Sequence, residues 1–586
     1  MTADPPAPRP TAPDKTRTGA GIWLAVAVLV LVTIAAYANS LHTPFIFDDG
    51  PSILKNPTIR QLTSVDVILQ PPGDTGQTVG GRPLLNFSLA VSYALSGLDP
   101  WGYHGLNVGI HVLAALALFG VVRRTLLLPR WAGRFGATAT LPALAAALLW
   151  AVHPLQTESV TYVIQRAESL AGLFYLVTLY AYIRGATGGS RGWWGTAVAG
   201  CLAGMATKET MVTAPVVIAL YDRVFLADSF RTVWRDRKGP LLGLAATWGL
   251  LAILVVDAAG RGGSAGFGQG MSVWAYALTQ AGAVVHYLRL VLWPNPLVVD
   301  YGNGLVAGPA VVLPQVLLLA GLGTAIIWAW PRWPAAAFAG AAFFLLLAPS
   351  SSLVPVLTQT MAEHRMYLPL APLCALVAAA AWCFGGRPAT AVVLLAGLVL
   401  LPVTWARNRL YQNPLALWRQ TLAAAPDNAR AHLCLGTALN HEGHLAEAIA
   451  EYREALRLKP GYIEVLNNLG IALQQQDRLP EAIEVYGELL HLKPDYPSAH
   501  YNFALALMRS GRLDEAITHF RIALQTRPHD PDLLCYLGNV EAATGQFDAA
   551  LTHFAAALRL RPDFPDAQRS LDLVRRQIRS PSILTP

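Results

Sequence analysis

The chain contains few charged residues and few cysteines for its length. Charged residues make up 13% of its 586 residues and apolar residues 54%, which excludes an ordinary soluble multidomain protein. This composition is typical of a chain that lies mostly in a membrane. The five cysteines follow no metal-binding or redox spacing, and those at 201, 374 and 383 lie in apolar runs, as packing residues do.

Several catalytic motifs are also absent from the sequence. It has no phosphate-binding glycine loop, no serine-hydrolase elbow and no plausible zinc spacing. The net charge of +7 comes mostly from Lys and Arg that flank apolar runs, as an inner-leaflet bias produces. It therefore gives no support for a nucleic-acid partner.

The sequence divides into an apolar part and a charged part. Residues 1–20 are rich in Pro, Thr, Arg and Lys, which predicts a disordered cytoplasmic tail. Residues 21–407 are a succession of apolar runs and predict a membrane domain. Residues 408–580 are charged and amphipathic without a run long enough to span, which predicts a second domain. The overall fold class is all-α.

The apolar runs predict 11 membrane spans. The first is Ile22–Tyr37, and a short helix opening at Arg82 and ending near Ser96 is expected to lie along the membrane surface. The other spans are expected at about 103–122, 137–152, 167–183, 193–207, 210–226, 240–258, 310–330, 334–348, 366–384 and 388–406. Polar residues interrupt Val273–Trp293, so we interpret it as a re-entrant or interfacial hairpin and not as a crossing.

The basic residues predict an orientation for this layout. Those of the tail and of several loops fall on one side, which the positive-inside rule makes cytoplasmic. They are Arg123, Arg124, Arg130, Arg134, Arg184, Arg191, Arg231, Arg235, Arg237, Lys238, Arg332 and Arg387. The second domain then lies on the outer side, whereas a full crossing by 273–293 would move it inside.

The second domain has an internal repeat of 34 residues. Prolines recur at this spacing from Pro426 to Pro562, as do Tyr452, Tyr486, Phe520 and Phe554. Small residues at helix crossings, an aromatic in the second helix and a proline at the turn indicate tetratricopeptide repeats. We predict an α-solenoid of four repeats, at 429–462, 463–496, 497–530 and 531–564, and a capping helix at 565–578. Asn468 and Asn502, one period apart, are weak candidates for binding an extended peptide.

An acidic pair, Asp48 and Asp49, follows the first span. Two carboxylates beside a membrane helix are costly to hold near lipid unless they have a partner or a function. Because an extended chain sends neighbouring side chains to opposite faces, we expect the two to have different tasks. One would accept a proton from an attacking hydroxyl, and the other would orient a sugar or a cation. The alternative is a solvated turn, which Asp49-Gly50 also favours.

Three further polar segments fall on the same predicted side. The first holds His153, Glu158, Arg166 and Glu168. Here Glu158 and Arg166 either form a structural ion pair, or Glu158 faces the acidic pair and Arg166 binds a phosphate. Lys208-Glu209 interrupts an apolar hairpin, as a snorkelling anchor or as the counter-charge of a lipid-linked phosphate. In Glu363-His364-Arg365, the basic pair would clamp a departing phosphate or serve as a plain membrane anchor.

One chemistry explains acids and bases gathered on one face of a polytopic protein. A sugar carried on a lipid phosphate lies at the bilayer surface, where Arg or Lys holds the phosphate. A carboxylate then deprotonates the incoming hydroxyl, and the sugar leaves its phosphate through a cation-like transition state. In this interpretation the solenoid presents the acceptor chain.

The sequence blocks that carry these groups resemble a known family. They are Phe47-Asp48-Asp49 with Asn56-Pro57, Arg82-Pro83-Leu84, Trp101-Gly102-Tyr103-His104, His153-Pro154-Leu155-Gln156-Thr157-Glu158-Ser159-Val160, Lys208-Glu209, and Ala362-Glu363-His364-Arg365-Met366-Tyr367-Leu368-Pro369. In this order they look like the transmembrane and tetratricopeptide-repeat O-mannosyltransferases of the C-type (GT-C) glycosyltransferase superfamily. The resemblance runs from about Ile22 to the end of the chain.

The resemblance implies a polyprenyl-phosphate-linked sugar donor, Ser or Thr acceptors in proteins, and inverting transfer of mannose or another hexose. It implies Asp48, Asp49 and Glu158 as catalytic residues. It implies donor-phosphate or substrate binding by Arg82, His153, Arg166, Glu168, Lys208, Glu209, Glu363, His364, Arg365 and Tyr367. The expected partners are the lipid-linked donor, acceptor proteins in the solenoid groove, and membrane lipids. No cofactor is firmly expected, although a divalent cation is a candidate near Asp48 and Asp49.

The Ala-, Leu- and Arg-rich composition looks bacterial, which places the chain in an inner membrane with its repeats in the periplasm; a eukaryotic chain would lie in the endoplasmic reticulum membrane. Two other functions are compatible with the sequence. One is a non-enzymatic membrane scaffold that collects partners for envelope or secretion machinery, and the other is a glycosyltransferase acting on glycolipid or polysaccharide. Eleven spans with charges on one face exceed what a scaffold's anchor needs.

Overall fold

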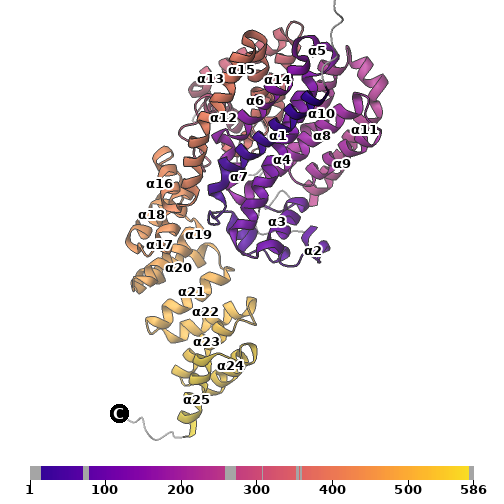
Figure 1. Cartoon of the computed structure of the whole chain (residues 1–586). Helices are drawn as coiled ribbons and strands as arrows, with labels where there is room; N and C mark the ends of the chain where they lie inside the picture. Colours follow the sequence, from indigo (N-terminus) through magenta and orange to yellow (C-terminus); the bar gives the residue numbers. More distant parts are fainter. Residues whose placement is uncertain are drawn as a thin grey trace, which may run out of the picture. The chain divides into compact units, whose positions relative to one another are not determined.

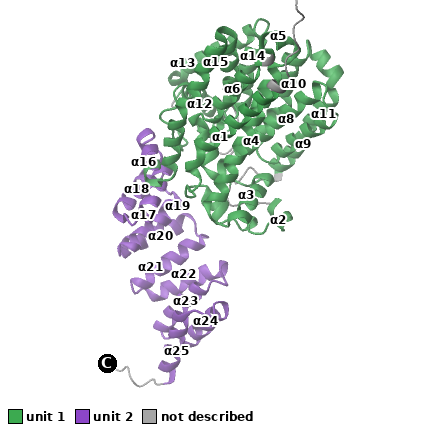
Figure 2. Ribbon diagram, in the orientation of Figure 1, with its two compact units in different colours: residues 1–417 green, residues 418–586 purple. Residues whose placement is uncertain are grey.

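In the computed structural model (Figure 1), every described element is a helix. The structure describes residues 15–69, 78–257, 272–306, 308–351, 355–356 and 359–579. The chain forms two compact units, residues 1–417 and 418–586 (Figure 2). The predicted boundary at 407/408 falls inside a helix that continues to Tyr411.

Unit 1 is a bundle of apolar helices joined by short polar segments. In chain order they are α1 Lys15–Tyr37, α2 Val65–Leu69, α3 Pro83–Ser96, α4 Pro100–Leu126, α5 Pro129–Phe135, α6 Thr140–Ala151, α7 Thr157–Thr161, α8 Arg166–Ala186, α9 Gly192–Met205, α10 Ala214–Tyr221, α11 Phe230–Asp257, α12 Val273–Leu292, α13 Pro309–Ala329, α14 Pro334–Leu347 and α15 Leu370–Tyr411. α16, Pro414–Ala424, continues from unit 1 into unit 2.

The described part of the chain contains five helices long and apolar enough to cross a membrane, or six if the bent pair α5–α6 is one span. They are α1, α4, α11, α13 and α15. The chain is thus a helical membrane protein, and the predicted number of 11 spans stays a prediction. α1 already begins at Lys15, within the predicted disordered tail, and residues 1–14 lie outside the described ones.

α15 combines the last two predicted spans in one bent helix. At 42 residues it would be about 63 Å long if straight, roughly twice the thickness of the hydrocarbon core. It bends at Gly386, whose backbone has φ 59° and ψ −141°. Glycine adopts such a conformation without a Cβ clash. The bend falls between the predicted spans 366–384 and 388–406.

α12 is one continuous helix of 20 residues, so the chain reversal predicted within 273–293 is wrong. α12 is not among the five candidate spans, and that this segment does not cross the membrane stays a prediction. The physical reason is that its polar residues find partners without a reversal of the chain. For example, the Gln280 side chain donates to the carbonyl of Thr360 at 2.9 Å. Near its start Tyr276 donates to the carbonyl of Ser350, and near its end His153 contacts the carbonyl of Val291.

α4 defines two ends of the bundle. It packs against α1, α6 and α8, and its 27 residues span about 40 Å. At its first turn the His104 ring contacts the carbonyl of Thr43, in the loop that carries the acidic pair, at 2.9 Å. At its last turns Arg123 donates to Thr140 and Thr125 pairs with Tyr221. The acidic loop and the arginine-rich turns therefore lie at opposite ends of α4.

Unit 2 is a stack of helix pairs. The pairs are α17 Ala429–His441 with α18 Leu445–Leu458, α19 Ile463–Gln475 with α20 Leu479–Leu492, α21 Pro497–Arg509 with α22 Leu513–Thr526, and α23 Pro531–Ala543 with α24 Phe547–Leu560, followed by α25 Pro565–Arg579. The first helices begin at the first residues of the four predicted repeats. Tyr452, Tyr486, Phe520 and Phe554 are each fully buried.

Close packing of small and aromatic residues within each pair predicts how unit 2 responds to substitution. A Cβ added at Gly470 would lie 2.5 Å from the ring of Tyr486, whereas one at Gly487 would meet nothing within 4 Å. We expect Gly470→Ala to destabilise unit 2 by about 1–3 kcal/mol through overpacking. Gly487→Ala, the matched control, should stabilise it by up to about 1 kcal/mol through helix propensity. Thermal unfolding followed by circular dichroism measures both, and equal effects of the two substitutions would refute the packing.

Candidate active site

The acidic pair lies in a tight turn and not in an extended segment. Asp49 donates its backbone N–H to the carbonyl of Ile46 at 2.9 Å, and Gly50 donates to that of Phe47 at 3.1 Å. Phe47 has φ 41°, in the left-handed region that a bulky side chain rarely adopts. Strained backbone of this kind gathers at functional sites. The expected extended conformation is therefore wrong, because a turn of this geometry closes over residues 46–50.

Asp49 is completely buried and holds two loops together. One carboxylate oxygen accepts the N–H of Ile46 at 3.0 Å and the other accepts the N–H of Ile164 at 2.9 Å. Burial is the main cause that raises its pKa to about 8, although these two hydrogen bonds lower it. Because both oxygens already have backbone donors, Asp49 has the contacts of a structural residue.

Asp48 lies in a different environment from its neighbour. Its residue is half-buried, and its backbone N–H donates to the hydroxyl of Tyr162 at 2.9 Å. The solvated-turn alternative does not describe this loop, since Asp49 is buried and Asp48 is partly covered. Among the described residues, no group of three or more His, Cys, Asp or Glu side chains could hold a metal ion. A cation here would rest mainly on Asp48, and it stays a prediction.

Glu158 and His364 form a buried pair across the bundle. One oxygen of Glu158 lies 2.7 Å from Nδ1 of His364, and the other accepts the backbone N–H of His364 at 2.8 Å. Burial raises the pKa of Glu158 to about 8 and lowers that of His364 well below its usual value, and nearby Lys208 lowers it further. The two shifts favour a protonated Glu158 beside a neutral His364 ring, so the pair carries no net charge at neutral pH. The predicted alternative, an ion pair of Glu158 with Arg166, is wrong because His364 occupies both oxygens.

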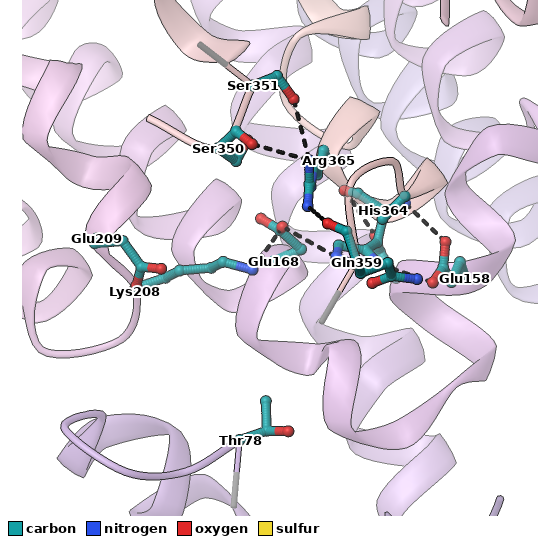
Figure 3. A network of polar contacts seen from close by, with 12 residues as sticks. Thr78, Glu158, Glu168, Lys208, Glu209, Ser350, Ser351, Gln359, His364 and Arg365 are labelled. Carbon is teal, nitrogen blue, oxygen red and sulfur yellow. Dashed lines mark hydrogen bonds and ion pairs between the residues drawn. The ribbon is translucent and has the colours of Figure 1, made fainter. Parts of the chain in front are cut away.

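A second pair extends this cluster (Figure 3). Nζ of Lys208 lies 2.6 Å from Glu168, whose carboxylate is 4.0 Å from Nε2 of His364. All three side chains are more than nine-tenths buried. Nearby, Arg82 pairs with Glu209 at 3.2 Å. Glu158, His364, Glu168 and Lys208 thus form a continuous row of alternating acids and bases, which we call the polar row.

Two arginines expected to bind phosphate are instead committed to the protein. Arg166 is fully buried, and its three nitrogens donate to Asn107 at 2.5 Å, to Ser88 at 2.8 Å and to the carbonyl of Tyr103 at 2.8 Å. Arg365 donates to the carbonyls of Ser350, Thr360 and Gln359, at distances from 2.6 to 3.1 Å. Both arginines therefore hold packed segments together, and the phosphate-binding roles predicted for them stay predictions.

His153 and Tyr367 are also structural in this fold. Nδ1 of His153 accepts the N–H of Leu155 at 3.2 Å, and Nε2 contacts the carbonyl of Val291. Burial lowers the pKa of His153 to about 4, so the ring is neutral and cannot clamp a phosphate by charge. The hydroxyl of Tyr367 contacts His111 at 2.9 Å inside the bundle. Both residues therefore have structural partners, and their predicted substrate-binding roles stay predictions.

Glu363 belongs to a network that the sequence did not reveal. It accepts the N–H of Val298 at 2.5 Å and the hydroxyl of Tyr301 at 2.7 Å. Burial raises its pKa to about 8, and Arg407 is the largest cause that lowers it. Arg407 acts on Glu158 in the same direction. The sequence could have indicated Arg407, because it is a charged residue near the end of a long apolar run.

The raised pKa of Glu363 predicts how stability depends on pH. Its folded-state pKa of about 8 lies above its ordinary value of 4.5, so the folded protein keeps a proton that the unfolded chain releases. This contribution is complete below about pH 4.5 and is lost as the pH rises towards 8. We expect Glu363→Gln to flatten the fall in melting temperature between pH 5 and 8. An unchanged slope would contradict this, and exposed Asp66→Asn is the control.

The predicted peptide-binding asparagines connect successive repeats. Asn468 on α19 donates to Thr437 on α17 at 3.4 Å. Asn502 on α21 donates to Asn467 on α19 at 3.2 Å. Both side chains are half-buried and lie on first helices. They therefore form a polar strip along the first helices of three repeats.

Comparison with known proteins agrees with both units. Tetratricopeptide repeat profiles match residues 467–531, 436–477 and 507–572. Over 284 residues the chain is 32% identical to Protein O-mannosyl-transferase Tmtc2 of Drosophila melanogaster, covering 45% of this chain and 29% of that protein. It is 24% identical over 452 residues to Protein O-mannosyl-transferase F38B6.6 of Caenorhabditis elegans, covering 73% and 62%. Among solved structures, the tetratricopeptide-repeat protein YrrB aligns with a TM-score of 0.26 at 21% identity, over 30% of this chain and 87% of YrrB.

The chain covers less than two thirds of the length of these two relatives. A similar partial match, 30% identity over 33% of this chain and 21% of the relative, is found with Protein O-mannosyl-transferase TMTC3 of Homo sapiens. The matches combine with the helical membrane unit, the repeat unit and the order of the polar blocks. The chain is therefore similar in sequence to proteins of the transmembrane and tetratricopeptide-repeat O-mannosyltransferase family.

Proposed function

We propose that the chain is a membrane glycosyltransferase that moves mannose or another hexose from a polyprenyl-phosphate donor to Ser or Thr hydroxyls of proteins. The observation that carries this proposal is the polar row, Glu158, His364, Glu168 and Lys208, buried at the same end of the bundle as Asp48. Buried acids and bases in such a row are costly to assemble, and they are typical of sites that move protons and bind charged substrates. The relatives named as transferases support the same activity.

Asp48 is the residue that we assign as the base. Asp49 has two backbone donors on its carboxylate, whereas Asp48 is half-buried and lies beside Tyr162. In the proposed reaction, Asp48 takes the proton of the acceptor hydroxyl while the oxygen of that hydroxyl bonds to the sugar's anomeric carbon. The bond from that carbon to the phosphate oxygen breaks, and the lipid phosphate leaves. This single displacement inverts the anomeric configuration.

Lys208 and Arg82 are the cations that we assign to the donor phosphate. Lys208 is paired with Glu168, and Arg82 is paired with Glu209 and also donates to the carbonyl of Thr78. Glu209 keeps about a third of its side chain exposed. Both cations act electrostatically on His364, so Arg82 lies near the polar row to which Lys208 belongs. A phosphate arriving here would share their charge with the two carboxylates. The added negative charge would raise the pKa of His364, so a proton could move towards it from Glu158.

Two further parts of the proposal concern the acceptor and the location. The polar strip of Asn468 and Asn502 would bind the backbone of an extended acceptor. Asn408, near the end of α15, donates to the carbonyl of Ala36 and accepts from Thr161, so α15 ends beside the end of α1. We propose that the polar row lies at the outer face of a bacterial inner membrane. The arginines at the other end of α4 support this side, because the positive-inside rule makes them cytoplasmic.

Deletion and complementation test this function. Intact-mass spectra of envelope proteins should lose single hexoses when the chain is deleted and regain them with the wild-type chain. Unchanged protein masses would favour the scaffold. A loss confined to glycolipid or polysaccharide sugars would favour the other transferase. Either result would overturn the proposed acceptor.

A further inference from the structure

A second candidate site lies at the other end of the bundle from the polar row. It is a groove of about 660 Å³ between α4, α8 and α10 on one side and α14 and α15 on the other. This volume falls in the range of about 300–1,000 Å³ that is usual for small-molecule sites. Its wall is almost wholly aliphatic and aromatic, and the hydroxyls of Thr125 and Tyr221 within it bond to each other at 2.6 Å. It therefore offers apolar contacts to a ligand and few hydrogen bonds.

Two arginines belong to the lining of this apolar groove. Arg134, in α5, donates to the carbonyl of Cys383 at 3.0 Å, and Arg332 donates to that of Trp328 at 3.1 Å. Both side chains are exposed, and each guanidinium has five donors, so these bonds leave further donors for a ligand. Trp131 and Trp333 lie next to them in the lining. Arginine beside tryptophan at the end of an apolar surface is the pattern of a lipid headgroup region.

We propose that this groove binds one anionic phospholipid from the cytoplasmic leaflet. Its phosphate would lie between Arg134 and Arg332, and its acyl chains would follow the groove towards Leu368, which also lines it. Charge complementarity selects an anionic headgroup, since two cations and no carboxylate are among the described lining residues. The leaflet follows from Arg123, Arg124 and Arg130, which lie with Arg134 at this end of the bundle and which the positive-inside rule makes cytoplasmic. The site does not depend on the proposed transferase activity.

Native mass spectrometry of the purified full-length chain tests this site. With equimolar phosphatidylglycerol and phosphatidylcholine, we expect one bound phosphatidylglycerol, preferred by a factor on the order of tenfold. Arg134→Gln with Arg332→Gln should bring the preference close to one. The matched control is Arg191→Gln with Arg387→Gln, two exposed arginines outside the lining, and it should keep the preference. Equal binding of both lipids by the wild type would overturn the proposal.

A second measurement is made on the wild-type chain, so its main result does not depend on how a variant folds. Phosphatidylglycerol with a photoreactive acyl chain should crosslink to peptides of α14 and α15. As an additional check, Ala339→Phe with Ala375→Phe, which fills the groove, should remove the crosslink while the melting temperature shows that the variant is folded. Crosslinks spread evenly over the apolar surface would overturn the proposal. A polyprenyl phosphate that displaces the lipid equally well from the wild type and from the Arg134 and Arg332 variant would also overturn it. The groove would then hold the polyprenyl chain of the donor.

Discussion

Asp48→Asn should lower sugar transfer by the purified protein by a factor of about 10²–10⁴, the usual contribution of a general base. The amide has the size of the carboxylate but accepts no proton. The backbone N–H of Asp48, which donates to Tyr162, is unaffected by the substitution. Because Asp48 is only half-buried and the amide has the same size, we expect the melting temperature to stay close to that of the wild type. Transfer from a lipid-phosphate hexose to a Ser/Thr peptide, followed by mass spectrometry, measures the change.

Two other variants separate the role of Asp48 from that of its neighbours. Asp66→Asn changes an exposed carboxylate in the same loop, on α2, and should leave both activity and melting unchanged. Asp49→Asn keeps one acceptor oxygen but places an amide against the N–H of Ile46 or Ile164. It should lower the melting temperature as well as the activity. If Asp48→Asn stays active while a stably folded Asp49→Asn does not, the assignment of the base is wrong.

Arg166→Ala should destabilise unit 1 by about 3 kcal/mol or more, the largest stability effect that we expect from one substitution. The change leaves the side chain of Asn107 and the carbonyls of Ser88 and Tyr103 buried without their donor. Arg166→Lys should recover only part of this stability, because one ammonium group cannot reach all three partners. Thermal unfolding in detergent measures both variants.

The control for this prediction is Arg231→Ala, an exposed arginine at the start of α11. It should melt close to the wild type. If Arg166→Ala also melts like the wild type but fails to bind the lipid-phosphate donor, Arg166 is a substrate residue after all.

The repeat unit was predictable because its information is local. The period of 34 residues is visible in the sequence, and each small residue meets its aromatic partner within the same repeat, as Gly470 meets Tyr486. The bend of α15 was predictable for a similar reason, since Gly386 interrupts a run too long for one span. In both cases, the residues that determine the structure are close together in the chain.

The roles of the charged residues were less predictable because their partners are distant in sequence. Position at a membrane boundary marks Arg166, Lys208 and Arg365 alike, and nothing local says which is committed to the protein. Arg166 reaches Ser88, 78 residues earlier, whereas Lys208 pairs with the carboxylate of Glu168. The same holds for Asp48 and Asp49, since the partner that buries Asp49 is the N–H of Ile164. Only the tertiary structure distinguishes these residues.

The anomeric configuration of the product tests the central claim most directly. The purified full-length chain would be incubated with a polyprenyl-phosphate hexose and a Ser/Thr peptide, and the glycopeptide examined by nuclear magnetic resonance. A base that activates the hydroxyl for direct displacement predicts one hexose on the hydroxyl, with the configuration opposite to that in the donor. A hexose attached with retained configuration, or no glycopeptide with any lipid-phosphate hexose, would contradict it.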